Sequence, residues 1–464
     1  MNKNLNIYFY FFVIYKKFNH TIPMLKAKNT LLSVLLIVFF STTSCERNTD
    51  ESPQDPNLVK NAILESMQEW YYWNDKLPSV VNVNSYGSND ELLYNLMYVE
   101  LDRWSYLTTK EDFDDAFTGQ NIGHGFGFGL NEDDELFVSF VYDDSPAGKD
   151  GWQRGWQIIE VNGKPIATYR VDGGYNFNLG ENVPGISNTF TFKLPDGSTT
   201  SRTNIKSDYQ ANSVLHKEII EEGNKKIGYW VYNSFKATAN LTPTKSLEVE
   251  ETLNYFESEN INELILDLRY NGGGSVDVAE QIMNALVPAE ANGKLMYTNA
   301  FNTDKDELNE ASNFEKLNNI DLTKLVVLTS RGSASSSELV INCLRPYMEV
   351  ILIGETTYGK PVGSFPLSSF NQTLDQNNVE LVPITFAIAN ASGEAEYYDG
   401  FPVDIEASDD PSVNWGDLED DKLSSAISYI LYGSLNSTSR LKPSKQQWQM
   451  IDGFTGLQKE FPVY

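Results

Sequence analysis

KLVVLTSRGSASSSELVINCLRPYMEVILIGETTYGKPVGSF, residues 324–365, decides the fold of this chain. Residues 325–328 and 350–353 are short apolar runs with β-branched members, the usual signal of a strand. Between them, residues 337–345 carry apolar side chains at helical spacing, and Pro346 discourages continuation of that helix. A strand, a crossover helix and a second strand predict two parallel strands whose following loops lie at the same sheet edge.

Two chemically distinct residues follow those strands. Ser335 lies after the first strand among small hydroxyl residues at a glycine turn, and Lys360 lies after the second between a glycine and a proline. Ligands of open α/β sheets bind outside the edge where the strands end. We therefore expect Ser335 and Lys360 to be neighbours in space.

A third loop is expected at the same edge. ELILDL, residues 263–268, predicts a buried strand that runs into RYNGGG, and apolar residues at helical spacing follow from Val276. The residues Gly272–Gly274 then connect strand to helix, with N–H groups free to face a ligand. A tight turn or a phosphate site are alternatives, although no P-loop lysine follows. Asp267 and Arg269 flank the strand end and predict a structural ion pair or a loop anchor rather than direct catalysis.

A hydroxyl nucleophile at this edge needs a base. The chain has three histidines, and a Ser-His-Asp triad would have to use His124 or His216 because His20 lies in the N-terminal leader. Neither of those two follows a predicted sheet strand. Lysine is the remaining candidate, but a free lysine with a pKa near 10.4 leaves only about one molecule in a few thousand neutral at pH 7. A lysine base therefore has to be desolvated.

Composition limits the classes of function. The chain has 464 residues, of which 41% are hydrophobic and 12% aromatic, as expected of a globular protein with two or three domains. Its net charge of -29 argues against nucleic acid and against an anionic bilayer surface as partners. The two cysteines, Cys45 and Cys343, cannot build a disulfide framework, and no CxxC or HExxH spacing is present. We therefore expect neither a metal nor another cofactor.

Residues 1–45 predict an export signal. From Met24 the chain has lysines before an apolar run, Leu31–Phe40, which is shorter than the roughly 20 residues of a membrane-spanning helix. The segment resembles a bacterial lipoprotein signal, in which Cys45 becomes the lipidated first residue, although Thr42 stands where leucine is commoner. This resemblance implies a lipid-anchored lipoprotein of the cell envelope that faces the periplasm or the exterior. An uncleaved signal anchor is the alternative.

A linker and a helical region follow the signal. Residues 46–57 are acidic and contain prolines, which predicts a flexible linker. Residues 58–118 predict a helical N-terminal region with an apolar stripe and an aromatic cluster at Trp70–Trp73. We expect that cluster to pack against another domain rather than to stack on a ligand.

Residues 119–208 change to short strands and glycines. Residues 123–166, GHGFGFGLNEDDELFVSFVYDDSPAGKDGWQRGWQIIEVNGKPI, resemble a PDZ domain of the bacterial protease type, although Gly155-Trp156 stands where Gly-Asp is usual. Physically, Gly125–Gly129 predicts a nest of free N–H groups for a terminal carboxylate, and a peptide could add beside the following strand. The predicted peptide-binding residues are Gly125, Phe126, Gly127 and Phe128. An ordinary glycine-rich turn is the alternative.

The two catalytic segments resemble a known family. GSASSSE at 332–338 and TYGK at 357–360 closely resemble the C-terminal processing peptidases, or tail-specific proteases, which are serine endopeptidases with a Ser-Lys dyad. DLRYNGGG at 267–274 and DGFPVDIEA at 399–407 extend the resemblance, which covers most of residues 57–432. It implies an α/β, ClpP/crotonase-like catalytic core at 209–432, followed by a C-terminal tail at 433–464, beside the helical region and the β-rich PDZ domain.

The resemblance also implies roles for single residues. Ser335 matches the nucleophile, Lys360 the general base, and the backbone N–H groups of Ser336 and of Gly273 or its neighbour the oxyanion hole. Ser364 stands where the family commonly has a glutamine that orients the lysine, so Ser364 or another group would give that support. We therefore predict an envelope serine endopeptidase that binds unfolded or C-terminal tails of protein substrates. A non-catalytic peptide-binding scaffold of the same fold is the alternative, and a small apolar ligand has little support.

Overall fold

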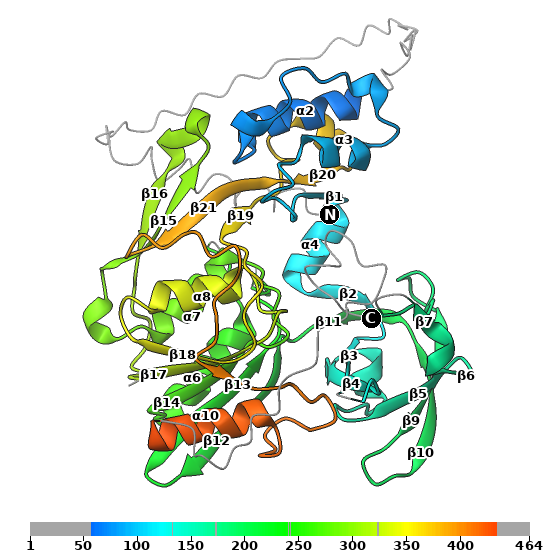
Figure 1. Ribbon diagram of the computed structural model, residues 1–464, viewed down its shortest axis with the longest axis vertical. Helices are drawn as coiled ribbons and strands as arrows, with labels where there is room; N and C mark the ends of the chain where they lie inside the picture. The colour runs from blue at the N-terminus through cyan, green and yellow to red at the C-terminus, as the bar shows by residue number, and fades with distance from the viewer. Residues whose placement is uncertain are drawn as a thin grey trace, which may run out of the picture.

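The computed structural model describes residues 57–433, apart from 132, 172, 173, 240, 242 and 323. The predicted export signal, Cys45 and the linker before residue 57 lie outside the described residues, as does the tail after residue 433. Within the described part of the chain, none of the helices has the length and apolar character needed to cross a membrane. Figure 1 shows three regions: helices of the N-terminal region, an α/β core, and a β-rich region beside the core.

The core is built on a six-stranded sheet in the order β12-β13-β14-β17-β18-β22. From β13 onward each strand runs parallel to its neighbour, and β12 forms an antiparallel edge with β13. This confirms the predicted parallel arrangement of the three loop-bearing strands. The strands are β12 Val214–Glu222, β13 Lys225–Tyr232, β14 Glu263–Asp267, β17 Lys324–Thr329, β18 Glu349–Gly354 and β22 Ile405–Glu406.

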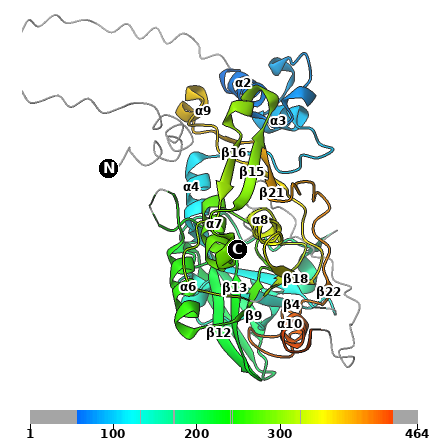
Figure 2. The ribbon, with the colours of Figure 1, turned by 90° about the vertical axis from the view of Figure 1, so that its left-hand side faces the viewer.

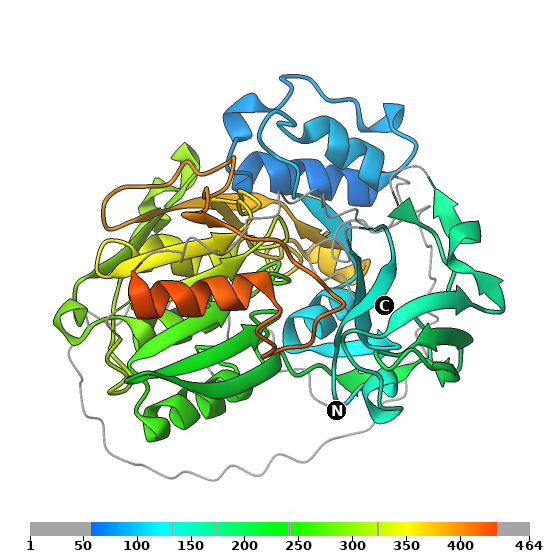
Figure 3. The same cartoon turned by 60° about the horizontal axis from the view of Figure 1, so that its bottom comes forward.

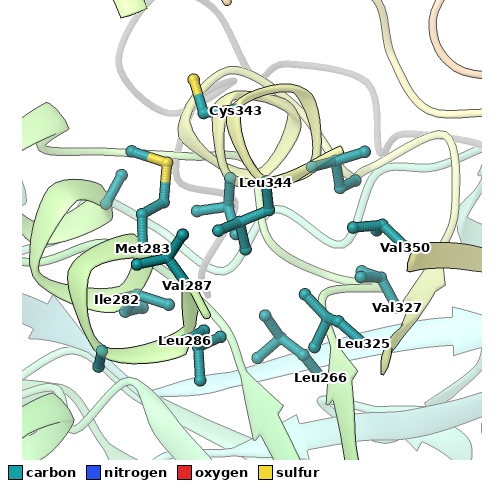
Figure 4. Close-up of a cluster of buried hydrophobic side chains, with 14 of the residues drawn as sticks. Leu266, Ile282, Met283, Leu286, Val287, Leu325, Val327, Cys343, Leu344 and Val350 are labelled. Atoms are coloured by element: carbon teal, nitrogen blue, oxygen red, sulfur yellow. The ribbon is translucent and has the colours of Figure 1, made fainter. Parts of the chain in front are cut away.

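Helices cover both faces of this sheet. Three of them pack on one face, and Figure 4 shows side chains of α7 and α8 meeting the strand residues Leu266, Leu325 and Val327. On the other face lies α10, which Figure 3 shows across the strands. Burial from both sides explains why these strands are nearly continuous apolar runs. The helices are α6 Leu247–Glu259, α7 Val276–Leu286, α8 Ser336–Leu344 and α10 Asp421–Tyr432.

A second, antiparallel sheet joins the core to the N-terminal region. It has the order β16-β15-β21-β19, and Figure 2 shows β15 and β16 rising from the core toward α2. A short pair, β1 with β20, lies beside it. The elements are β15 Leu295–Phe301, β16 Glu310–Asn313, β19 Val362–Ser364, α9 Gln372–Gln376, β20 Glu380–Val382 and β21 Ile384–Asn390.

The N-terminal region is helical only in part. It contains α2 Leu58–Trp70, α3 Asn89–Leu96, the strand β1 Tyr106–Thr108 and α4 Lys110–Thr118, so its elements are mainly helical, and β1 is a strand that the sequence pattern did not indicate. Trp70 lies against Phe365 and Phe370, with ring centroids 5.5 and 4.7 Å away. The aromatic cluster therefore packs on the segment that follows Lys360, which confirms the expectation of packing against another region.

The β-rich region forms an antiparallel sheet in the order β10-β9-β5-β4-β3 around its own apolar core, with β6 paired to β5. A two-stranded ribbon, β2 with β11, leads into and out of it. Its elements are β2 Gln120–Gly123, β3 Phe126–Leu130, β4 Leu136–Val141, α5 Pro146–Lys149, β5 Gln157–Val161, β6 Lys164–Pro165, β7 Arg170–Val171, β8 Gly174–Tyr175, β9 Ser187–Lys193, β10 Thr199–Ile205 and β11 Ser207–Gln210.

Candidate active site

Ser335 lies between β17 and α8 in a rare backbone conformation. Its φ is +55° and its ψ is −115°, angles that cost a residue with a side chain about 1–3 kcal/mol and that collect at functional sites. The surrounding hydrogen bonds hold it there: its N–H donates to Glu338 Oε2 (3.0 Å), and its carbonyl accepts the N–H of Leu339 (2.8 Å). The hydroxyl-bearing residue is thus fixed at the N-terminal tip of a helix.

The glycine loop after β14 touches this turn. A Cβ on Gly273 would lie 2.7 Å from Ser335 Cβ and 3.0 Å from the carbonyl oxygen of Ala334, and its φ of +112° also excludes other residues. The N–H of Ala334 donates to the carbonyl of Asn271 (3.1 Å). The predicted meeting of these two loops is therefore confirmed.

The predicted oxyanion donors, the backbone N–H groups of Ser336 and Gly273, have different surroundings in the structure. Ser336 is the first residue of α8, where backbone N–H groups have no partner within the helix, and its nitrogen lies 3.1 Å from where a Gly273 Cβ would be. The Gly273 N–H, in contrast, donates to Asn271 Oδ1 (2.9 Å). The expectation of free N–H groups across 272–274 was therefore wrong at Gly273, because the asparagine side chain turns back onto its own loop.

Lys360 lies at the same edge, in the loop after β18. The residue is 8% exposed. Its backbone N–H donates to Glu338 Oε2 (2.8 Å), the same oxygen that accepts the N–H of Ser335. The N–H of Tyr358, two residues earlier, donates to the carbonyl of Ser333 (2.9 Å). Two kinds of hydrogen bond therefore join the serine loop to the lysine loop: bonds from both loops to the Glu338 carboxylate, and a direct bond between backbone groups.

Glu338 is a residue of this site whose role was not predicted from the sequence. Its buried carboxylate also accepts the N–H of Gly359 (2.7 Å) and the hydroxyl of Thr357 (2.6 Å). Burial raises the pKa of Glu338, and the hydrogen bonds that it accepts oppose that rise. A signal was present, since a glutamate three residues after a serine at a helix start is the pattern of a capping box.

Ser364, the predicted support for Lys360, lies in the last position of β19. It is half-buried and stands opposite Ile384 of β21. Its support of Lys360 stays a prediction.

Asp267 and Arg269 form a structural ion pair, as predicted, within a larger buried network. The fully buried Arg269 contacts Asp267, Asp409 and Asp420, and Arg154 of the β-rich region also contacts Asp409 (3.2 Å). Burial alone would raise the pKa of Asp409, but the guanidinium groups of Arg269 and Arg154 outweigh it and hold that pKa well below its ordinary value. The network joins the β-rich region to the core.

The two histidines within the described residues, His124 and His216, each lie against a polar side chain. His124 is fully buried; its Nδ1 lies 2.7 Å from Asn204 Oδ1, and burial lowers its pKa to about 4. His216, in β12, lies 3.3 Å from Glu218. His20 lies outside the described residues.

The predicted peptide-binding stretch begins at a turn and continues as a strand. Gly125 has the positive φ of a turn (+82°), but Phe126–Leu130 form β3, whose residues pair with β4. A Cβ on Gly127 would collide with the ring of Phe140 at 2.2 Å. Packing under that ring favours a glycine at this position, and binding of a carboxylate or peptide at Gly125, Phe126, Gly127 and Phe128 stays a prediction. β3 is the last strand in its sheet order, so one of its edges faces away from β4.

This chain is similar to two protein-family models and to several single proteins. The model of "Peptidase family S41" matches residues 226–385, and that of "Peptidase S41 N-terminal domain" matches residues 59–106. A carboxyl-terminal-processing protease of a Picosynechococcus species is 25% identical over 348 residues, which are 71% of this chain and 78% of that protein. A CtpA-like serine protease of Staphylococcus aureus is 27% identical over 273 residues, 56% of this chain. This chain spans 49% of the staphylococcal protein.

One solved structure shares the fold. The crystal structure of an S41 protease from Bacteroides fragilis is 24% identical to this chain, with a TM-score of 0.64. The likeness covers 80% of this chain and 96% of the bacteroidal one. Both chains therefore have the same mixed α/β architecture.

Proposed function

This chain belongs to peptidase family S41, the family of the C-terminal processing peptidases, and on that premise we propose that it is a serine endopeptidase with Ser335 as nucleophile and Lys360 as general base. One observation supports this assignment above the others. A single oxygen of Glu338 accepts the N–H groups of both residues, at 3.0 and 2.8 Å. The two backbone nitrogens are therefore less than about 6 Å apart, close enough for a serine and a lysine side chain to meet.

The proposed chemistry follows from this placement. Ser335 Oγ attacks the scissile carbonyl carbon while the neutral amine of Lys360 takes the hydroxyl proton. The oxyanion is stabilised by the N–H of Ser336 and an N–H of the glycine loop, which Asn271 has to release if the donor is Gly273. Each such donor is worth about 2.7–4 kcal/mol to the transition state. Lys360 then protonates the leaving amine, and water attacks the acyl-enzyme with Lys360 again as the base.

The β-rich region is proposed to be a PDZ domain that captures unfolded or C-terminal tails. Support comes from the place of β3 at the end of its sheet order, since β-augmentation adds an extended peptide beside the outermost strand of a sheet. The candidate residues remain Gly125, Phe126, Gly127 and Phe128. We also propose that the core is ClpP/crotonase-like and that a lipid anchor on Cys45 attaches the protease to the cell envelope.

A hydrolysis assay tests the dyad. The substrate is an unfolded protein with an apolar C-terminus, and wild type is compared with Ser335→Ala, Lys360→Ala and the control Lys324→Ala. Lys324 lies in β17, at the other end of the strand that leads to Ser335. We expect both dyad variants to lose turnover by at least about 1000-fold and the control to keep it.

Two other results would change the assignment. Equal turnover in all four proteins would contradict the dyad. Binding of the substrate tail without hydrolysis, even by wild type, would instead support a peptide-binding scaffold.

A further inference from the structure

Arg103, in the N-terminal region, lies on a turn that is fixed from several sides. The buried carboxylate of Asp102 accepts the hydroxyl of Tyr71 (2.7 Å) and the N–H groups of Trp104 and Ser105, both at 3.0 Å. This turn is therefore held by Tyr71, the residue that follows α2, and it presents the exposed Arg103 at a defined place.

The guanidinium of Arg103 reaches the lysine loop. Its Nη2 lies 3.2 Å from the carbonyl oxygen of Tyr398, 3.3 Å from that of Gly359 and 3.4 Å from that of Tyr358. The guanidinium carbon also lies 5.0 Å from the ring centroid of Tyr358 and 4.9 Å from that of Trp104. Stacking of this kind restrains an exposed arginine that would otherwise sample many rotamers.

The same loop is held from its other side by Glu338. The two peptide units before Lys360 donate their N–H groups, those of Gly359 and Lys360, to this carboxylate at 2.7 and 2.8 Å. Their carbonyls, those of Tyr358 and Gly359, are the ones that face Arg103. In a trans peptide unit the N–H and the C=O point in opposite directions. The Glu338 carboxylate therefore binds these two peptide units on their N–H side, and the Arg103 guanidinium binds them on their C=O side.

The loop needs such a clamp because of Gly359. Its φ is +93°, and a Cβ there would lie 2.2 Å from the carbonyl oxygen of Tyr398, so no other residue fits. Glycine is also the residue with the greatest backbone freedom, and it directly precedes the proposed base. Without restraint on both sides, Lys360 would be less well placed relative to Ser335.

We propose that Arg103 is a positioning residue for Lys360, so that the N-terminal region completes the active site of the core. This inference rests on the proposed dyad. It assigns Arg103 no contact with substrate; the arginine acts through the peptide planes before the base.

The test compares Arg103→Met, which keeps the apolar stem, with Arg103→Lys, which keeps a cationic donor. Lys76→Gln is the control, since it removes an exposed positive charge elsewhere in the same region. We expect Arg103→Met to lower kcat by about 10-fold to 100-fold with KM unchanged, Arg103→Lys to recover part of that loss, and the control to match wild type. Turnover is expressed per folded molecule, measured by circular dichroism.

Each result has a distinct meaning. Wild-type kcat per folded molecule in Arg103→Met, with Lys360→Ala inactive, would overturn the role of Arg103 and leave the dyad standing. A Met variant that only unfolds more easily would also overturn it. Full activity of Lys360→Ala would refute the dyad itself, and the positioning role with it.

Discussion

Two buried carboxylates, Glu338 and Asp409, differ in what surrounds them. Glu338 accepts hydrogen bonds from backbone N–H groups and a hydroxyl of the serine and lysine loops. Asp409 faces the guanidinium groups of Arg154 and Arg269, one from the β-rich region and one from the core. A carboxylate that binds backbone fixes the geometry of loops, whereas a carboxylate between arginines fixes two regions to each other. We therefore expect Glu338 to control turnover and Asp409 to control stability.

The largest expected effect is on catalysis. In Glu338→Gln the amide nitrogen would face N–H donors that now meet a carboxylate oxygen, so the loops of Ser335 and Lys360 would separate. We expect turnover to fall by about 100-fold or more while the fold is retained. Steady-state hydrolysis and circular dichroism measure the two effects.

Glu380→Gln is the matched control. Glu380 is also buried, and it accepts the N–H (2.8 Å) and hydroxyl (2.6 Å) of Ser368, away from both catalytic loops. Its substitution should reduce stability without reducing turnover per folded molecule. Equal losses of turnover in the two variants would show that any buried glutamine has this effect and would remove the special role of Glu338.

The second effect is on stability. Asp409→Asn leaves the buried guanidinium groups of Arg154 and Arg269 without their shared anion, and breaking a buried ion pair in this way costs about 3–5 kcal/mol. Urea unfolding should show that loss, with a smaller change in turnover per folded molecule than in Glu338→Gln. A wild-type free energy of unfolding would contradict the network's role in joining the two regions.

The smallest effect depends on pH. The pKa of His124 is lowered from 6.5 to about 4 in the folded protein, chiefly by burial, so the unfolded state takes up the proton first as the pH falls. The stability tied to this residue is complete above pH 6.5 and is lost as the pH falls toward 4. Between pH 7.5 and 5 wild type should lose about 2 kcal/mol more than His124→Gln. Parallel pH profiles of the two proteins would contradict this account.

The sequence predicted the scaffold of the candidate site well. The apolar runs at 325–328 and 350–353 are too strong to belong to loops, and the helix between them leaves parallel pairing as the simple solution. That topology alone brings the loops of Ser335 and Lys360 to one edge, and the glycine loop before α7 joins them for the same reason.

The parts that could not be predicted depend on side chains that reach distant backbone. Arg103 contacts a loop more than two hundred residues later in the chain, and no local pattern indicates that contact. Arg154 pairs with Asp409 across two regions for the same reason. The packing of Gly127 under the ring of Phe140 is a contact between neighbouring strands that no local pattern indicates either.

The most direct test of the central claim is acylation of Ser335. Intact protein is treated with a serine-reactive fluorophosphonate, and the modified residue is located by peptide mass spectrometry in wild type and in Lys360→Ala. The account predicts rapid labelling at Ser335 in wild type and at least about 100-fold slower labelling in the lysine variant. Labelling that avoids Ser335, or that proceeds equally fast without Lys360, would contradict it.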